Sequence, residues 1–289
     1  MAGGVLLAVR AELATRPGHD TLGTLLVRWA LIAVSLAFLG GLLLAPLAVV
    51  FVTAFEHGLA KYLEVFLDPD TRSAIRLTLL AAAVVVPLNT VFGLAASWCI
   101  AKFEFRGKSF LITLIDLPLA ISPVISGMLF VLLFGLQGWF GNWLVAHDIS
   151  IIFAFPGIIL AEMFVTFPYV ARELIPLMQQ LGNDEEEAAI TMGAGGWITF
   201  FRVTLPKVRW GLIYGVILCN ARAMGEFGAV SVVSGHIRGL TDTMPLQIEI
   251  LYNQYDFVGA FAVASLLTLL AVLTLAIKAL VERTGYKQR

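Results

Sequence analysis

Long uncharged stretches, rich in apolar residues, recur along the chain and are separated by shorter segments that hold most of the charges. The first, residues 29–55, is bounded by Arg28 and Glu56. As an α-helix its 27 residues would measure about 40 Å, more than the roughly 30 Å hydrocarbon core of a bilayer. The stretch is also too long for the apolar region of a cleaved signal peptide, so we expect a first membrane helix here.

Five more such stretches follow. Inside lipid the backbone must satisfy its hydrogen bonds internally, which favours helices, and each stretch is too long for a barrel strand of about 9–11 residues. We therefore predict an all-α membrane protein with six transmembrane helices, preceded by residues 1–28 and followed by a tail, residues 278–289. The expected spans, which make up a transmembrane domain of residues 29–277, are 29–55, 77–101, 109–136, 149–170, 211–234 and 257–277.

Composition supports this class and excludes others. The chain of 289 residues is 59% hydrophobic and only 13% charged, with a mean hydropathy of +0.90, whereas soluble domains are about 25% charged. A net charge of −1 leaves no general basic surface for nucleic acid. Cys99 and Cys219 lie in apolar runs and the four histidines are scattered singly, so we expect no metal centre and no cofactor.

Lysine and arginine are unequally shared between the two sides of the predicted helices. Fourteen fall on the side that holds residues 1–28 and 278–289, and four fall on the other side. The excess of positive charge in membrane proteins lies on the cytoplasmic side. We therefore expect both termini in the cytoplasm, which also favours an even number of spans.

The cytoplasmic loop between the fourth and fifth spans has about forty residues, far more than most helix connections need. Asn183 and Glu186 form a plausible capping box, and the carboxylates of residues 184–187 suit the positive end of a helix dipole. Gly193 is expected to end this helix. Gly195 and Gly196 then permit a bend.

A second short helix after the bend would carry an aromatic face of Trp197, Phe200 and Phe201. Helices that lie on lipid headgroups are usually rich in Lys and Arg on their polar face, whereas this loop is acidic where it begins. The pattern therefore favours docking onto a protein partner over a membrane-surface role, which stays the alternative.

The same loop carries a motif. Glu187-Ala188-Ala189, three residues, Gly193, nine residues, Val203, one residue and Leu205-Pro206 resemble the EAA loop of ABC importer permeases, with Val203 where Ile is common. The resemblance implies the type I ABC importer permease fold. It also implies that these seven residues belong to a coupling loop, residues 183–206, which sits in a groove of an ATPase subunit and transmits its closure to the membrane helices.

Other segments extend the resemblance. Residues 220–235 resemble the fifth helix of the sulfate/thiosulfate and molybdate permeases, and residues 116–118, 122–124 and 245–249 resemble the sulfate group, in particular its W-type subunit. This implies a location in the bacterial cytoplasmic (inner) membrane. The implied partners are a second permease subunit, a dimer of ATPase subunits and a periplasmic or extracellular substrate-binding protein. A molybdate/tungstate-type permease is the nearest alternative.

No ATP site is expected in the chain itself. Gly107-Lys108-Ser109 resembles the end of a phosphate-binding loop, but that loop needs a Gly at position 102, where the chain has Lys102. We therefore expect a transport subunit and no enzyme, with ATP hydrolysis on a partner. A gradient-driven secondary transporter is a less favoured alternative, since no clear repeat relates residues 29–136 to 149–277.

Four residues are candidates for the translocation pathway or its gate. Arg222 is expected near the middle of the fifth span, where an unpaired cation is costly, and Glu226 would lie one helical turn away on the same face. An ion pair that only locks the bundle is the alternative reading. Ser122 and Ser126 lie where Pro118 and Pro123 should interrupt the third span. Backbone N–H groups freed by the break, together with the serine hydroxyls, could hold an oxyanion. An ordinary proline kink is the alternative explanation of the same pattern.

Overall fold

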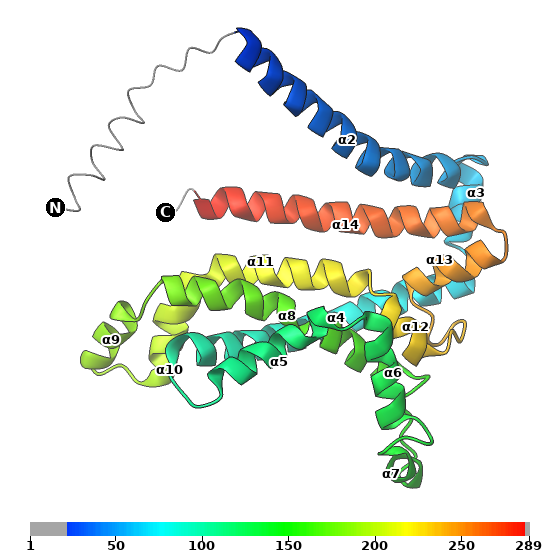
Figure 1. The fold of residues 1–289 in the computed structure, drawn as a ribbon. Helices are drawn as coiled ribbons and strands as arrows, with labels where there is room; N and C mark the ends of the chain where they lie inside the picture. The colour runs from blue at the N-terminus through cyan, green and yellow to red at the C-terminus, as the bar shows by residue number, and fades with distance from the viewer. Residues whose placement is uncertain (1–21, 287–289) are drawn as a thin grey trace. The chain divides into compact units, whose positions relative to one another are not determined.

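The computed structural model describes residues 22–286, whose regular elements are all helices, with no strand among these residues (Figure 1). The chain divides into two units, residues 1–49 and 50–289. The described part of the first unit belongs to α2 (Leu22–Ala54), whose large apolar side chains, Leu36 and Leu43 among them, are mostly exposed. A helix with so much apolar side-chain surface favours an apolar environment such as lipid.

The second unit is built around α8 (Phe155–Gln180). This helix packs against α4 (Pro69–Lys102), α11 (Leu205–Met224) and α5 (Lys108–Ala120). Apolar residues occupy several faces of α8, which is the pattern of a helix that is buried on most sides. Its fully or nearly fully buried side chains include those of Ile158, Ala161, Val165, Val170, Ala171, Leu174 and Met178.

Small residues let the three central helices approach closely, as is common between membrane helices. A Cβ atom added to Gly93 of α4 would lie 2.8 Å from the Cβ of Val170, and one added to Gly215 of α11 would lie 3.2 Å from the Cα of the same valine. A polar contact fixes the same interface, because the Asn89 amide donates to Oγ1 of Thr166 at 2.7 Å. The packing of α4, α8 and α11 therefore depends on both shape and a buried hydrogen bond.

The third expected span is broken, as its two prolines suggest. It consists of α5 and α6 (Pro123–Phe134), which are bent by 108° relative to each other. Ser122, just before Pro123, has an extended backbone with ψ of 135°, because the proline ring excludes the helical conformation at that position. Pro118 lies inside α5 and does not end it. The short helix α7 (Gly141–Ala146) follows α6.

The fifth expected span differs from the prediction of one helix over residues 211–234. α11 begins earlier, directly after α10 (Gly196–Thr199) and the π-helical turn η1 (Phe200–Thr204), and the helix ends at Met224. After three residues α12 (Gly228–Ser234) continues at an angle of 51°. Gly225 forms the end of α11, and the carboxylate of Glu226 accepts a hydrogen bond from the N–H of Ala229, which stabilises a new helix start.

The fourth expected span, 149–170, corresponds to α8, which begins at Phe155 and continues to Gln180. Arg172, expected in the following loop, therefore lies within the helix, and its Nε lies 3.3 Å from Oδ1 of Asp116 in α5. By length and composition, three helical stretches could cross a membrane: Leu25–Ala54, Pro69–Lys102 and Phe257–Leu280. Counting each bent pair as one span gives five. The expected six spans and cytoplasmic termini remain predictions.

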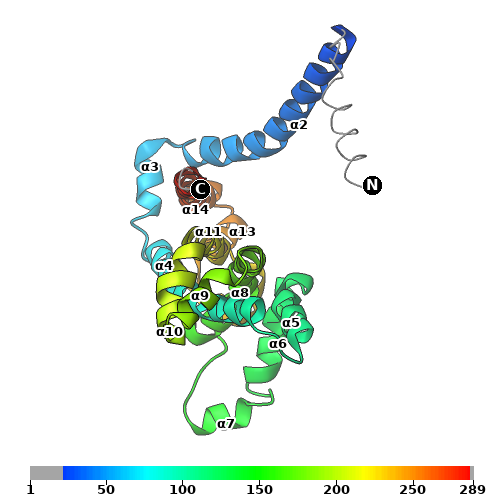
Figure 2. The ribbon, with the colours of Figure 1, turned by 90° about the vertical axis from the view of Figure 1, so that its left-hand side faces the viewer.

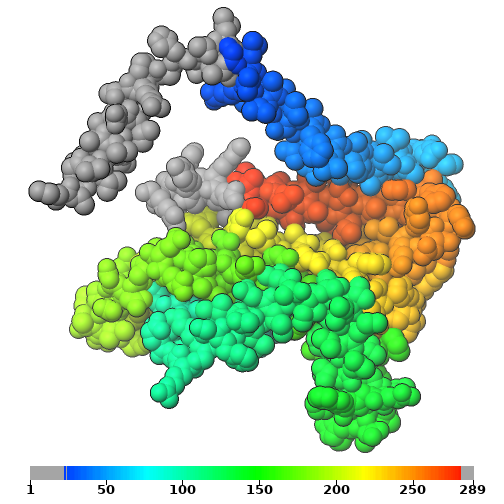
Figure 3. Space-filling model, in the orientation of Figure 1, coloured from blue at the N-terminus to red at the C-terminus, as the bar shows by residue number. Residues whose placement is uncertain are grey.

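Short helices lie at both ends of the second unit (Figures 1 and 2). At one end are α3 (Gly58–Val65) and α13 (Met244–Asn253), beside the start of α14 (Phe257–Tyr286). At the other end α9 (Asp184–Thr191) and α10 form the surface beyond the ends of α4 and α8 (Figure 3). The predicted coupling loop is therefore a compact structure at one end of the bundle.

Candidate functional site

The loop between α8 and α11 contains the two short helices that the sequence predicts. α9 begins directly after Asn183, and its first turn holds four carboxylates, Asp184 to Glu187, which interact favourably with the helix dipole. Gly193 follows the end of α9 with φ of +90°, a left-handed conformation that favours glycine. The prediction that Gly193 ends the helix is confirmed.

The predicted capping box is wrong. The side chain of Asn183 makes no capping bond to α9, and its Oδ1 instead accepts a hydrogen bond from Nζ of Lys102 at 3.0 Å. Glu186 does not turn back to the helix start. Its Oε1 lies 3.0 Å from Nζ of Lys102 and accepts a hydrogen bond from the Thr204 hydroxyl at 3.1 Å. An ammonium group makes a stronger, charge-assisted bond than a neutral backbone amide, which explains the preference.

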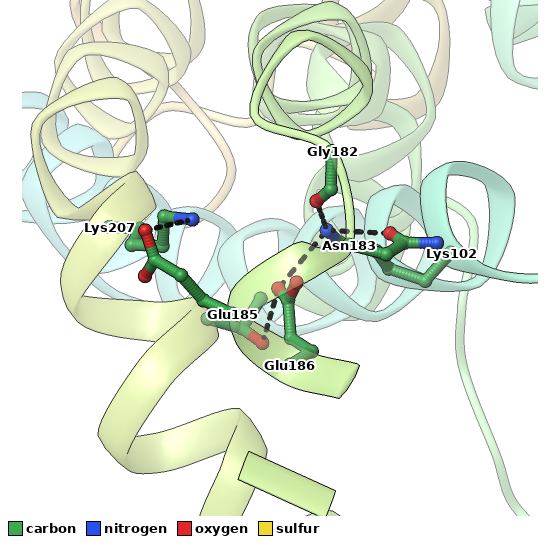
Figure 4. Close-up of polar contacts among 7 residues, drawn as sticks. Lys102, Gly182, Asn183, Glu185, Glu186 and Lys207 are labelled. Carbon is green, nitrogen blue, oxygen red and sulfur yellow. Dashed lines mark hydrogen bonds and ion pairs between the residues drawn. The ribbon is translucent and has the colours of Figure 1, made fainter. Parts of the chain in front are cut away.

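Ion pairs attach α9 to two of the central helices (Figure 4). Lys102 is the last residue of α4, and its ammonium also donates to the carbonyl oxygen of Gly182. On the other side of α9, Oε1 of Glu185 lies 2.9 Å from Nζ of Lys207 in α11. The first turn of α9 is therefore held between α4 and α11.

The aromatic residues of the second short helix separate into two groups. Trp197 and Phe201 are 74% and 57% exposed, and their rings stack at 6.1 Å. Phe200 was expected on the same face but is buried, with its ring 5.0 Å from that of Trp98 in α4. Residues four apart in a helix share a face, which places Trp197 with Phe201 and turns Phe200 toward the bundle.

The residues of the EAA-like motif also divide by exposure. Glu187, Ala188, Gly193 and Pro206 are exposed, whereas Ala189 is buried and Val203 and Leu205 are half-buried. Exposed Ile190 and Met192 lie beside them in the sequence and add apolar surface. The loop thus presents acidic and apolar groups outward on a base that is packed against the bundle.

The expected ion pair between Arg222 and Glu226 is present, with 2.7 Å between Nη1 and Oε2. It does not lie within one helix, because α11 ends at Met224 and Glu226 sits in the break before α12. The Glu226 side chain is fully buried, while that of Arg222 is 32% exposed. The pair therefore stabilises the bend between the two helices and leaves part of the cation accessible.

The two candidate serines lie at the other break. Ser122 is exposed and immediately precedes α6. Ser126 is fully buried, and its hydroxyl donates to the carbonyl oxygen of Ser122 at 3.3 Å. Gly127, the next residue, packs against α12, where an added Cβ would lie 2.7 Å from the Ala229 carbonyl oxygen. Only Ser122 of the two presents its side chain at the surface.

A buried carboxylate lies at the opposite end of the second unit from α9. Asp242, between α12 and α13, is 1% exposed, and neither of its oxygens has a hydrogen-bond partner among the described residues. The pKa of this carboxyl group is raised to about 7, chiefly by burial; nearby Asp70 and Glu249 contribute to the rise, and Arg238 opposes it.

Sequence reasoning missed Lys102 and Thr204, and it misread Glu186. In the sequence, Lys102 stood out only because it occupies the position where a phosphate-binding loop would have a glycine. Its distance from Asn183, 81 residues along the chain, hides the contact from any local pattern. The one available signal for the inward position of Glu186 was its spacing from Ala189. The two residues are three apart in α9 and share one helix face, which is buried.

The chain is similar in sequence to a family of transport proteins. The family model for the binding-protein-dependent transport system inner membrane component matches residues 89–285. The sulfate transport system permease protein CysW of a Synechocystis strain is 50% identical over 264 residues, covering 91% of this chain and 96% of the relative. CysW of Escherichia coli is 49% identical over 255 residues, covering 88% of each chain.

A second type of relative and a solved structure extend the comparison. The sulfate transport system permease protein CysT of Escherichia coli is 36% identical over 252 residues, covering 87% of this chain and 91% of the relative. The crystal structure of a bacterial ABC transporter that imports alginate has a similar fold, with a TM-score of 0.73 and 18% identity over 90% of this chain and 95% of that chain. The chain belongs to the family of binding-protein-dependent transport system inner membrane components.

Proposed function

We propose that this chain is a permease subunit of an ATP-driven sulfate importer. The observation that carries the proposal is the identity of about 50% to CysW permeases over nearly the whole length of both chains. The more distant match to CysT supports a second, related permease as the other half of the pathway. A solved importer with an alginate-bound periplasmic protein supports a substrate-binding protein as a further partner.

The energy for transport comes from a separate ATPase in this proposal. The surface formed by α9, Gly193 and exposed Trp197 and Phe201 docks onto that subunit, and closure of the ATPase dimer displaces the loop. The acidic first turn of α9 and the exposed aromatic rings give this contact its charge and its apolar area. Glu187 and Ala188 face the partner, while Ala189, Val203 and Leu205 hold the loop to the bundle.

Arg222 and Glu226 form the gate element of the pathway in this proposal. Both lie at the break between α11 and α12, and Arg222 remains partly exposed although it is paired. Because Glu226 neutralises the cation, the pair guides an anion without binding it tightly. Ser122 is a candidate for contact with the anion, whereas the buried hydroxyl of Ser126 is engaged within α6.

The proposed topology has six spans with both termini in the cytoplasm of a bacterial cell, and the chain lies in the inner membrane. In the second unit, α4 and α8 end, and α5 and α11 begin, at the end that carries α9 (Figure 1). The last helix, α14, also runs toward that end. These directions support one cytoplasmic face that holds the coupling loop and the C-terminal tail.

Uptake of radiolabelled sulfate into proteoliposomes tests the function. The complete transporter is reconstituted with its second permease, its ATPase and its binding protein, and we expect uptake that requires hydrolysable ATP. Excess unlabelled sulfate should compete, and molybdate should not. Competition by molybdate alone would indicate the molybdate/tungstate class, and uptake driven by an ion gradient without ATP would indicate a secondary transporter.

A pair of glycine variants tests the role of the coupling loop in the same assay. An added Cβ meets no atom within 4 Å at either Gly193 or Gly195, but only Gly193 has a positive φ. Gly193→Ala therefore strains the backbone by about 1–2 kcal/mol and should displace α9, whereas Gly195→Ala should not. We expect less sulfate transported per ATP hydrolysed for Gly193→Ala, and equal ratios for both variants would refute the coupling role.

A further inference from the structure

The side chain of Lys102 ends at a junction of three segments. Its ammonium group donates to the carbonyl oxygen of Gly182 after α8 and to Oδ1 of Asn183, and it forms an ion pair with Oε1 of Glu186 in α9 at 3.0 Å. Three oxygen atoms from the end of α8 and the start of α9 therefore surround one ammonium group. Figure 4 shows the lysine pointing between these groups. Lys102 is therefore fully engaged although it lies at a helix end.

The ion pair between Lys102 and Glu186 is shielded from solvent. The two side chains are 9% and 12% exposed, and Met178, Leu181 and Val208 close the gap around them so that no water molecule fits. Shielded charges interact more strongly than charges in water. Glu186 also accepts a hydrogen bond from Thr204 at the end of η1, so the pair joins α4, α9 and the start of α11.

The neighbouring pair between Glu185 and Lys207 provides a contrast. Its distance is similar, 2.9 Å, but the Glu185 side chain is 63% exposed. Solvent and salt weaken such a pair, so it holds α9 only loosely. Two adjacent glutamates in the first turn of α9 therefore make one shielded and one exposed link to the bundle.

The far end of α4 is also attached. The hydroxyl of Ser73 donates to the carbonyl oxygen of Gly239 at 2.7 Å, and the hydroxyl of Thr78 accepts from the N–H of Met244 at 2.8 Å. Both partners lie between α12 and the first turn of α13. α4 thus runs from the coupling helix at one end of the second unit to the segment after the Arg222 and Glu226 break at the other.

We propose that the ion pair between Lys102 and Glu186 transmits the displacement of α9 to α4, which carries it to the opposite end of the membrane domain. This inference rests on the proposed function, because it presupposes an ATPase that moves α9. Lys102 is a positioning residue in this role and contacts no substrate. The opposite charges of Lys102 and Glu186 resist separation, so the pair can pull α4 as well as push it.

The test compares charge-removing and charge-keeping variants in the reconstituted transporter. Lys102→Met and Glu186→Gln should each lower the amount of sulfate transported per ATP hydrolysed by about five- to tenfold, within the range found for coupled sites. ATP hydrolysis itself should continue. Lys102→Arg keeps the charge and should retain most of the ratio. Glu64→Gln, at the exposed pair with Lys61 in α3, should leave the ratio unchanged.

The double variant Lys102→Met with Glu186→Gln separates a link from two independent effects. If the two groups act as one link, the double variant loses no more than the worse single variant. Losses that multiply would overturn the proposal, and so would a wild-type ratio in Lys102→Met or Glu186→Gln. A merely structural role would lower the amount of assembled complex and would not change the ratio for the complex that remains.

Assembly of the complex is measured alongside by co-purification. If Lys102→Met does not assemble, Glu186→Gln decides, because it keeps the size of the side chain and an oxygen that can accept the hydrogen bond from Thr204. Failure of both variants to assemble would also overturn the proposal, since the pair would then be needed for folding. If the wild-type complex carries no sulfate at all, the proposed function is wrong. If the wild type transports sulfate and the variants keep the wild-type ratio of sulfate to ATP, only this inference is wrong.

Discussion

Gly93 provides a sharp test of the central packing. It lies in α4 opposite Val170 of α8, and an added Cβ would lie 2.8 Å from the Cβ of Val170 and 2.9 Å from its Cγ1. Ordinary carbon contacts are about 3.5–4.0 Å, so Gly93→Ala requires the helices to separate by roughly 0.7 Å or more. Rotation of the valine cannot relieve the contact, because the position of a Cβ is fixed by the backbone.

We expect Gly93→Ala to lower the free energy of unfolding by about 1–3 kcal/mol, the usual cost of overpacking. At about 2–4 °C per kcal/mol this corresponds to a melting temperature several degrees lower. Thermal unfolding of the purified protein in detergent measures the change. Gly41→Ala in α2 is the matched control, since its Cβ would meet no atom within 4 Å and alanine favours a helix.

A second substitution at Val170 shows whether the named contact is the cause. Val170→Ala removes Cγ1 and Cγ2 but keeps Cβ, so it should restore Gly93→Ala in part. Val170→Gly also removes Cβ and should abolish the additional cost of the alanine at position 93. An unchanged melting temperature for Gly93→Ala would refute the close approach of α4 and α8. A cost of Gly93→Ala that stays the same with Val, Ala or Gly at position 170 would refute it as well.

Two further predictions concern buried charges. Because folding raises the pKa of Asp242 from 3.8 to about 7, the folded state binds the proton more tightly, and stability falls as the pH rises between these values. The free energy of unfolding of the wild type should drop by about 1.4 kcal/mol from pH 6 to pH 8, whereas that of Asp242→Asn should change less. Thermal melting at each pH measures both values. An equal pH dependence of the two proteins would contradict the raised pKa of Asp242. Arg222→Met leaves the buried Glu226 charge unpaired and should lower the free energy of unfolding by about 3–5 kcal/mol. Glu226→Gln should cost less, because the Arg222 charge that it leaves unpaired is partly exposed to solvent. The double variant Arg222→Met with Glu226→Gln should recover part of the lost stability in the same melting assay. A loss in the double variant equal to the sum of the two single losses would refute the pairing.

Local rules worked well where the deciding residue and its effect lie close together in the sequence. Pro123 predicted a break that the structure places directly before it, and Gly193 predicted the end of α9. The rules failed for the capping box, because they assumed that Asn183 and Glu186 would satisfy the helix start between themselves. Lys102 offered both side chains a charged partner from a distant helix.

The same distinction explains the fifth span. A continuous apolar stretch predicts a membrane helix but does not locate a bend within it, because a Gly costs a helix only about 1 kcal/mol and is often tolerated. The bend after Gly225 depends on Glu226, which pairs with Arg222 and caps α12 at once. The expectation that Arg222 and Glu226 pair was right, although the helix assumed between them was wrong.

The sequence by itself determined the helical membrane class, most of the apolar segments, and the family to which the chain belongs, because these depend on composition, periodicity and motifs that are local. Only the tertiary structure decided which glutamate of α9 is shielded, that Phe200 faces the bundle, and that Lys102 joins α4 to the coupling loop. Those features depend on contacts between residues far apart in the chain, and burial, which decides the strength of each charge pair, exists only once the helices have packed.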